Sequence, residues 1–163
     1  MKEIPLTQGK IALVDDEDFE KIKAHKWFAL RAKGTNFYAA RSVRKIERGT
    51  VNIIRIFMHR EIMNPPDGLE TDHKDGNGLN CQKDNLRICT RQENGRNRKK
   101  WKDTVSCFKG VYWKKDRKKW GAHIKFDGKT KHVGYFKEEE NAAAAYDAEA
   151  KKLFGEFARG NFA

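Results

Sequence analysis

The sequence LETDHKDGNGLNCQKDNLRICTRQENGRNR, residues 69–98, joins two short β-type runs through a loop rich in glycine and asparagine. It predicts a strand over 69–73, a loop over 74–84 and a second strand over 86–89. Thr90 and Glu93 then have the spacing of a capping box, which satisfies free backbone N–H groups at the start of a helix. The stretch therefore predicts a strand–loop–strand–helix unit.

Four polar side chains occupy this unit: Asp72 and His73 end the first strand, Asn85 begins the second, and Asn94 falls in the first turns of the helix. Successive side chains of a straight strand point to opposite faces, so the strand must end, twist or bulge if Asp72 and His73 are to serve one site. Carboxylate and carboxamide oxygens suit Mg²⁺ or Mn²⁺. A neutral imidazole can deprotonate water near neutral pH. These residue types at these intervals predict metal-assisted hydrolysis of a phosphodiester.

The positive charge of the chain is concentrated after this unit. Of the net charge of +12, most comes from residues 96–132, which hold 14 lysines and arginines against 3 acidic residues. Trp101, Trp113 and Trp120 are interleaved with them. A basic surface binds polyanions by releasing their counterions, and aromatic residues would be poor choices for a merely solubilising surface. We therefore expect nucleic acid as the partner, although packing in a core is an open alternative for Trp113 and Trp120.

Composition sets the broad class. A chain of 163 residues with 38% hydrophobic and 36% charged residues favours small modules with modest cores. No apolar run approaches a membrane span or a signal-peptide core, so we expect an intracellular chain that does not enter a membrane. Cys81, Cys89 and Cys107 form no Cys-x-x-Cys pair, which predicts buried or half-buried thiols rather than a disulfide framework or zinc knuckle.

The remaining segments give an α+β fold. Residues 1–57 read mostly as strands, over 10–14, 27–30, 36–40 and 51–57, with a short helix after Asp15 or Asp16 and hairpin turns at Gly34 and Gly49. We expect one or two helical turns over 57–63. The predicted organisation is a β-rich segment over 1–57, a catalytic module over 58–100, a linker over 101–107 and a C-terminal domain over 108–163.

Residues 69–98, with Met58-His59-Arg60 upstream, resemble the HNH nuclease motif, or ββα-metal fold, in the variant of phage and intron homing endonucleases. The resemblance implies that Asp72 is a metal ligand, His73 the general base, Asn85 a residue that orients the base or its loop, and Asn94 the second protein ligand. It implies a Mg²⁺ or Mn²⁺ site without a small-molecule cofactor. The last histidine of the motif is Asn94 here, which argues against an all-histidine zinc site.

The resemblance also implies cleavage of double-stranded DNA to a 5′ phosphate and a 3′ hydroxyl, in the cytoplasm of a bacterial or phage-infected cell. One catalytic module predicts nicking, unless two chains assemble; the sequence leaves monomer and dimer open. For His59, the sequence leaves open a contact to DNA phosphate and a packing role.

The C-terminal segment is similar to the Apetala/ethylene-response-factor DNA-binding domain, which has a three-stranded antiparallel sheet packed on one helix. The sequences that carry the likeness are FKGVYW (108–113), KWGAHIK (119–125), VGYF (133–136), EENAAAAYD (139–147) and NF (161–162). Asp127-Gly128 is a hairpin turn signal, and Ala142, Tyr146 and Ala150 recur at helical spacing.

By that likeness, five side chains face DNA: Lys109, Tyr112, Lys114, Lys125 and His132. Several of these positions hold arginine or tryptophan in the plant proteins, and bidentate reading of guanine needs the arginine fork. We therefore do not expect the plant GC-rich target, and we expect the lysines to contact mainly phosphates.

The sequence thus predicts an HNH-type DNA endonuclease placed on DNA by a C-terminal sheet domain. The alternative from another class is a non-catalytic DNA-binding regulator that retains the HNH segment as scaffold. Binding or cleavage of RNA is a third possibility.

Overall fold

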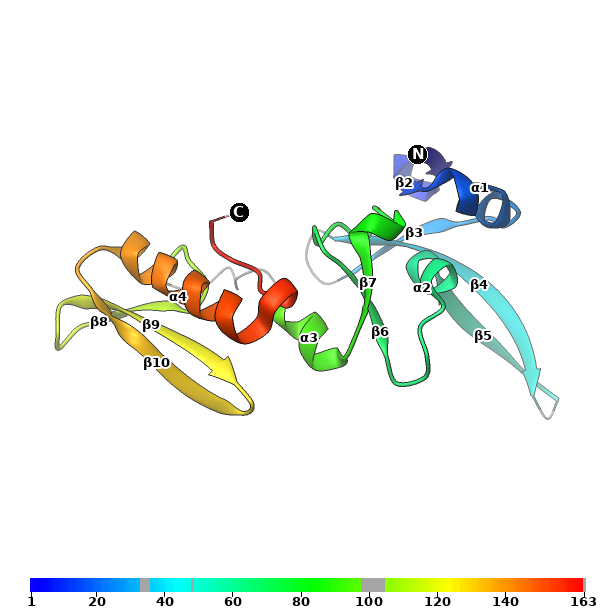
Figure 1. Ribbon diagram of the computed structural model, residues 1–163. Coiled ribbons are helices and arrows are strands. Elements are labelled where there is room, and N and C mark those ends of the chain that lie inside the picture. Colours follow the sequence, from blue (N-terminus) through cyan, green and yellow to red (C-terminus); the bar gives the residue numbers. More distant parts are fainter. Residues whose placement is uncertain (33–35, 48, 98–104, 163) are drawn as a thin grey trace. The chain divides into compact units, whose positions relative to one another are not determined.

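The α+β class predicted from the sequence is confirmed. The computed structural model describes residues 1–32, 36–47, 49–97 and 105–162 (Figure 1). The predicted turn at Gly34, Trp101 and part of the predicted linker lie outside these residues. The chain forms two compact units, Met1–Arg91 and Gln92–Ala163. Among the described helices, none is long and apolar enough to cross a membrane.

The first unit contains three small antiparallel sheets with orders β1-β2, β3-β4-β5 and β6-β7. Its elements in chain order are β1 (Lys2–Pro5), the 3-10 helix η1 (Thr7–Gly9), β2 (Ile11–Val14), α1 (Asp16–Lys23), β3 (Phe28–Arg31), β4 (Phe37–Glu47), β5 (Thr50–Phe57), α2 (Met58–Met63), β6 (Glu70–His73), η2 (Lys83–Asn85) and β7 (Leu86–Cys89). The helix α3 (Arg91–Arg96) follows at the border of the units.

One hydrophobic core serves this whole unit. Its buried members come from the β-rich N-terminal part and from the region around the Asp-His pair: Ile4, Ala12, Val14, Ile22, Trp27, Ala39, Met58, Ile62, Cys81 and Leu86. The indole N–H of Trp27 donates to the carbonyl of Ile22 at 2.8 Å, so the large side chain is buried without an unpaired donor. Residues 1–57 are therefore part of the same folded body as the predicted nuclease motif.

The loop between β6 and β7 is tied to the N-terminal strands through its backbone. The amide of Leu13 donates to Leu79 at 2.9 Å, and the amide of Cys81 donates to the carbonyl of Leu13 at 2.8 Å. Asp15, just after β2, accepts the amide of Lys83 at 2.7 Å. A long loop that uses its backbone groups in this way has few conformations left, which fixes the ends of β6 and β7.

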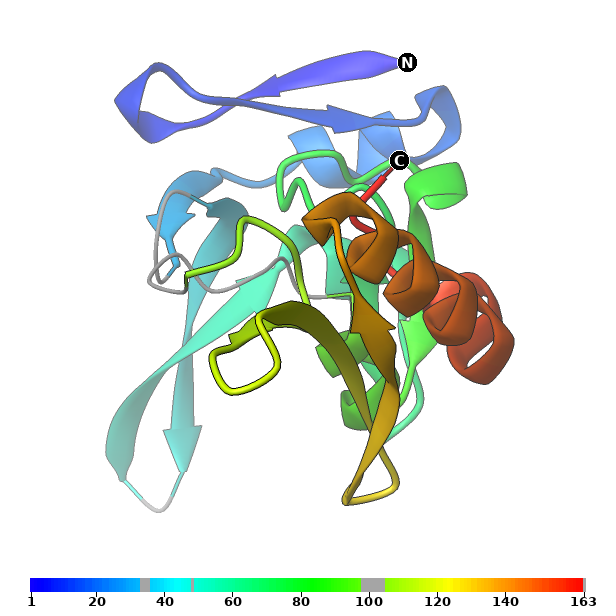
Figure 2. The ribbon, with the colours of Figure 1, turned by 90° about the vertical axis from the view of Figure 1, so that its left-hand side faces the viewer.

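The second unit is a three-stranded antiparallel sheet, order β10-β9-β8, covered on one face by a long helix (Figure 2). Its elements are β8 (Val111–Lys114), β9 (Lys119–Phe126), β10 (Lys129–Phe136), α4 (Glu139–Phe154) and the 3-10 helix η3 (Gly155–Phe157). The core lies between the sheet and α4, where Val111, Ala122 and Ile124 meet Ala142 and Tyr146. The predicted sheet, its Asp127-Gly128 turn and the helix over the alanine run are all present.

A polar clasp closes this unit near its C-terminal end. The carboxamide of Asn161 accepts the amide of Lys109 at 2.6 Å and donates to the carbonyl of Lys109 at 3.2 Å. It also donates to Asp147 on α4 at 2.9 Å. The backbone of the last described residues is thereby held to both the entry of β8 and the covering helix.

Candidate functional site

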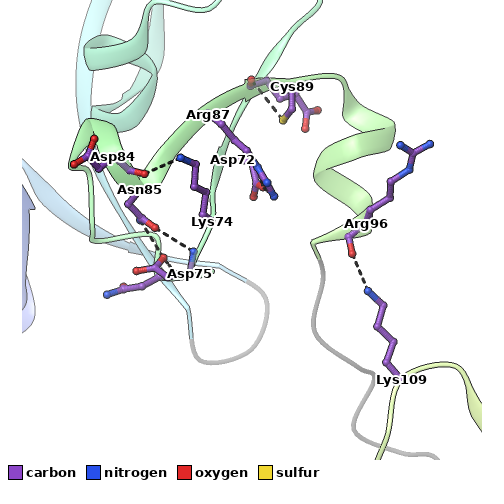
Figure 3. Close-up of polar contacts among 11 residues, drawn as sticks. Asp72, Lys74, Asp75, Asp84, Asn85, Arg87, Cys89, Arg96 and Lys109 are labelled. Carbon is purple, nitrogen blue, oxygen red and sulfur yellow. Dashed lines mark hydrogen bonds and ion pairs between the residues drawn. The ribbon is translucent and has the colours of Figure 1, made fainter. Parts of the chain in front are cut away.

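Asp72 lies on β6 directly opposite Arg87 on β7. Nε and Nη2 of Arg87 donate to Oδ2 of Asp72 at 3.0 and 2.7 Å, and the two side chains are only 10% and 7% exposed (Figure 3). Charge-assisted bonds of this kind are strong, and removal of either partner leaves a buried charge. The two bonds from Arg87 thus hold the side chain of Asp72 in one orientation.

His73, the last residue of β6, is buried among aromatic side chains. Its ring centroid lies 4.8 Å from that of His59 and 5.8 Å from that of Tyr38. Its Nε2 lies 3.9 Å from Sγ of the buried Cys81. The pairing of β6 with β7 is regular through Asp72 and His73, so strand alternation directs the two side chains to opposite sides of the ribbon. The strand ends at His73, and the convergence of Asp72 and His73 on one site stays a prediction.

The surroundings of His73 favour its neutral form. Burial lowers the pKa of His73 to about 4, and this effect outweighs the opposing influence of Asp75 and Asp72. Burial also lowers the pKa of His59 to about 3, assisted by His73 and Arg60. Both imidazoles are therefore uncharged at neutral pH, the state in which a histidine can accept a proton.

Asn85 organises the loop that follows His73. Its Nδ2 donates to Oδ1 of Asp75 at 3.0 Å and to the carbonyl of Asn80 at 2.8 Å, and its Oδ1 accepts the amide of Asp75 at 3.1 Å (Figure 3). Asp75 in turn accepts the amide of Asn77 at 2.7 Å. These bonds hold the turn at 75–80 against the start of β7, so Asn85 acts on the loop immediately after the imidazole.

Asn94 is half-buried on α3. It belongs to the second compact unit, whereas Asp72 and His73 belong to the first. The joint ligation of one ion by Asp72 and Asn94 therefore stays a prediction.

The donor chemistry around Asp72 fits a hard cation. A carboxylate has two oxygens and about four lone-pair positions, so the pair with Arg87 is compatible with metal ligation. The described residues hold no cluster of three or more His, Cys, Asp or Glu side chains suited to a metal ion. An ion at Asp72 would then take carboxamide, water or substrate oxygens as its other ligands, which is the preference of Mg²⁺.

The second unit presents the face of its sheet that α4 does not cover. The register pairs Tyr112 with Gly121 and His123 with His132, on the side opposite Ala122 and Ile124, which pack under the helix. Four predicted DNA-facing residues share this open side: Tyr112, Lys114, Lys125 and His132. Tyr112 packs over Gly121, where a Cβ would lie 2.5 Å from the tyrosine ring, so the sheet is flat and aromatic there.

Lys109 lies apart from these four because it precedes β8. Its Nζ donates to the carbonyl of Arg96 at the end of α3, at 2.7 Å (Figure 3). Burial lowers the pKa of Lys109 to about 8, with a further contribution from Arg159. In the structure this ammonium group makes an internal hydrogen bond, and its contact to DNA stays a prediction.

Sequence reasoning did not single out several residues around the Asp-His pair. Arg87 stands opposite Asp72 only because of the strand register, and Tyr38 reaches His73 from β4. His59 had been left between a phosphate contact and packing; it is 8% exposed and stacks on Phe57 at 5.5 Å, so it packs. The Asn-Leu-Arg run at the start of β7 drew attention to the position of Arg87, but it carried no signal for the contacts of Tyr38 and His59.

Comparison with known proteins identifies a matching family and two relatives. The family described as HNH endonuclease matches residues 63–96, which contain Asp72, His73, Asn85 and Asn94. A protein of Acanthamoeba polyphaga mimivirus, named as an uncharacterized HNH endonuclease, L560, is 31% identical over 156 residues, or 94% of this chain and 76% of its own length. Protein 3.8 of Escherichia phage T7 is 37% identical over 94 residues, or 58% of this chain and 77% of its own. No solved structure matches. Because the similarity to the mimivirus protein extends over almost all of this chain, the chain belongs to the HNH endonuclease family.

Proposed function

We propose that this protein is a metal-dependent DNA endonuclease in which His73 is the general base and Asp72 and Asn94 hold the metal ion. The observation that carries the proposal is the state of His73. It is a buried, uncharged imidazole at the end of a strand, next in sequence to a buried carboxylate, and the loop that follows it is pinned by Asn85.

His73 would take the proton from the attacking water. An imidazole held neutral by burial is available as an acceptor across the neutral pH range. The aromatic rings of Tyr38 and His59 restrict its orientation, which reduces the entropy lost on reaching the reactive geometry. The products would be a 5′ phosphate and a 3′ hydroxyl.

Asp72 and Asn94 would supply oxygen ligands to Mg²⁺ or Mn²⁺. When bound, such an ion neutralises the charge that develops on the phosphate and on the leaving oxygen. Arg87 holds the carboxylate of Asp72 in place, so the ligand does not have to be ordered by the ion. Asn85 would keep the loop of Asp75 and Asn80 in place beside the base.

The second unit would position the enzyme on duplex DNA through the open face of its sheet. Its three antiparallel strands with one covering helix have the arrangement of the Apetala/ethylene-response-factor domain that the sequence resembles. Lys114 and Lys125 would contact phosphates, and Tyr112 and His132 would contribute to recognition of the bases. A single catalytic module per chain favours nicking over a double-strand break.

A non-catalytic regulator is the second candidate, because the buried Asp72–Arg87 pair by itself would also serve a purely structural role. Conversion of a supercoiled plasmid to the open-circular form, with Mg²⁺ or Mn²⁺, separates the two functions. We expect the wild-type protein to nick and His73→Ala to lose about 100-fold or more of the rate. His25→Ala, which changes an exposed histidine of the same unit, is the matched control.

Nicking that persists in His73→Ala would reject the base assignment. Failure of the wild-type protein to cut any DNA with either metal would favour the regulator. Competition of binding by duplex DNA against duplex RNA tests the choice of nucleic acid.

A further inference from the structure

The β4–β5 hairpin carries a second surface outside the proposed catalytic site. The two strands pair without interruption from Ala40↔Phe57 to Glu47↔Thr50. In both ribbon views this hairpin extends beyond the other elements of its unit (Figures 1 and 2). Every described residue of 44–47 and 49–55 is exposed. A two-stranded ribbon without a covering layer is normally marginal in stability, so its length calls for a function.

One face of the hairpin combines arginines with bare aliphatic side chains. Strand alternation and register place six residues on this arm face: Ser42, Arg44, Ile46, Val51, Ile53 and Arg55. Ile46 is 73% exposed and Ile53 is 71% exposed. The arm face has no acidic residue. Exposed aliphatic residues of this kind mark a binding surface rather than a solvated one.

The opposite face differs, because its charges are matched within the protein. Nε of Arg41 donates to Glu61 at 2.9 Å, and Lys45 pairs with Glu47 at 2.5 Å. Lys45 thus provides a control position on the same hairpin, close to Arg44 but on the other side.

We propose that the arm face binds duplex DNA in the major groove; this inference rests on the proposed DNA endonuclease function. Two strands about 4.8 Å apart, with their side chains, fit a groove about 12 Å wide. Arg44 and Arg55 match the charge of phosphates and the acceptors of guanine, and the β-branched side chains match thymine methyl groups. Pairing of the arm face with a second copy would instead bring four arginines together, which like charges oppose.

The geometry also sets where these contacts fall. β4 begins beside the catalytic imidazole, since Tyr38 lies 5.8 Å from His73, and it continues to Glu47 at the hairpin end. The nine residue steps from Tyr38 to Glu47 span about 30 Å in a strand. With about 3.4 Å per base pair, the arm would reach about nine base pairs from the scissile phosphate.

The test is binding of the full-length protein to a 40-base-pair random-sequence duplex, with EDTA present so that no cutting occurs. We compare the wild type, the double variant R44Q/R55Q and the control K45Q over a range of salt concentrations. R44Q/R55Q should bind at least about tenfold more weakly. Its slope of log K against log salt should be shallower by about 1.8, since each lost phosphate contact contributes about 0.9. K45Q should bind as the wild type does.

A second measurement locates the arm on DNA. On a fragment with one cleavage position, hydroxyl-radical protection should disappear in R44Q/R55Q only on one side, about four to six base pairs from the nick, because Arg44 and Arg55, which lies opposite Ser42, are about six and four strand steps from Tyr38. Hydrogen exchange of the β4–β5 amides should be unchanged, since both arginines are exposed.

Each outcome has one meaning. If R44Q/R55Q binds and protects DNA as K45Q does while the wild type nicks plasmid, DNA binding by the arm face is rejected and the proposed endonuclease function stands. If DNA binding depends on the arm face but the wild type never nicks plasmid, the endonuclease function is rejected and DNA binding by the arm face stands. A change in sedimentation of the free protein, without a change in DNA affinity, would identify a second copy as the partner and overturn the proposal.

Discussion

His59 should make the first unit sensitive to acid, and His59→Phe should remove that part of the sensitivity. The imidazole is 8% exposed, its Nδ1 has no hydrogen-bond partner among the described residues, and it stacks on Phe57 and meets His73 edge-on. Burial lowers its pKa from 6.5 to about 3. Folding therefore favours the neutral ring, and phenylalanine can occupy the same aromatic pocket without a titrating group.

Proton linkage gives the direction and the size of this change in unfolding free energy with pH. A histidine with a depressed pKa in the folded state contributes its full stability above the unfolded pKa of 6.5 and loses it as the pH falls toward about 3. At pH 5 the unfolded chain is almost fully protonated at His59 and the folded chain is not. The corresponding loss of stability between pH 7 and pH 5 is about 2 kcal/mol for this one group.

Native-state hydrogen exchange of the β6 and β7 amides measures this free energy within the first unit, after correction for the pH dependence of the intrinsic rates. We expect the loss between pH 7 and pH 5 to be about 2 kcal/mol smaller in His59→Phe than in the wild type. His25→Phe, at an exposed position, should keep the wild-type loss. Equal losses in the wild type and His59→Phe would refute the assignment of a buried neutral imidazole.

Two further predictions concern the second unit. Asn161→Ala removes three hydrogen bonds of the clasp, one of them to a carboxylate, and should lower the free energy of unfolding by about 3 kcal/mol in urea titrations. Asn141→Ala, on the exposed side of α4, is the control and should lower it little. A small loss at both positions would contradict the stabilising role of the clasp. The double variant K114Q/K125Q should lower the salt slope of duplex binding by about 1.8. Lys131→Gln should leave the salt slope unchanged, because Lys131 pairs with Glu149 on the helix side of the sheet. Equal salt slopes in the wild type, K114Q/K125Q and Lys131→Gln would argue against the open face as the DNA-binding surface.

Much of the fold could be predicted because its signals are local. The Asp127-Gly128 turn adopts positive φ at both residues, as a tight hairpin requires, and the alanine-rich run forms α4. β6, β7 and the start of α3 directly after Thr90 also follow from short-range patterns. These elements depend on turn chemistry and periodicity within about ten residues.

The missed elements depend on partners far along the chain. β1 was not predicted because its four residues include Pro5 and gain their strand conformation by pairing with β2. β4 extends well past the predicted end at residue 40, through the polar run RSVRKIE, because β5 pairs with all of it. Cys107 is exposed, although all three thiols were expected to be buried or half-buried. Trp113 is 39% exposed and packs edge-on against Trp120, which lies on the core.

For the candidate site, too, local features could be predicted and long-range contacts could not. Positions 72, 73 and 85 could be selected as candidate site residues from the sequence, since each follows from the chemistry of a short motif. The pairing of Asp72 with Arg87 depends on strand register, and the wall of Tyr38 and His59 around His73 depends on the packing of β4 and α2. Such long-range contacts set the charge state of the imidazole, and no local pattern encodes them.

The common core of the first unit limits how this protein can be engineered. The segment recognised as the family motif begins at residue 63, but Cys81 and Leu86 within it pack against side chains such as Val14 and Ile22. Transplanting the motif alone into a fusion protein would expose that apolar surface and free the backbone partners on Leu13. The smallest transferable cassette on the N-terminal side is therefore the entire stretch from Met1, rather than the portion that carries the signature.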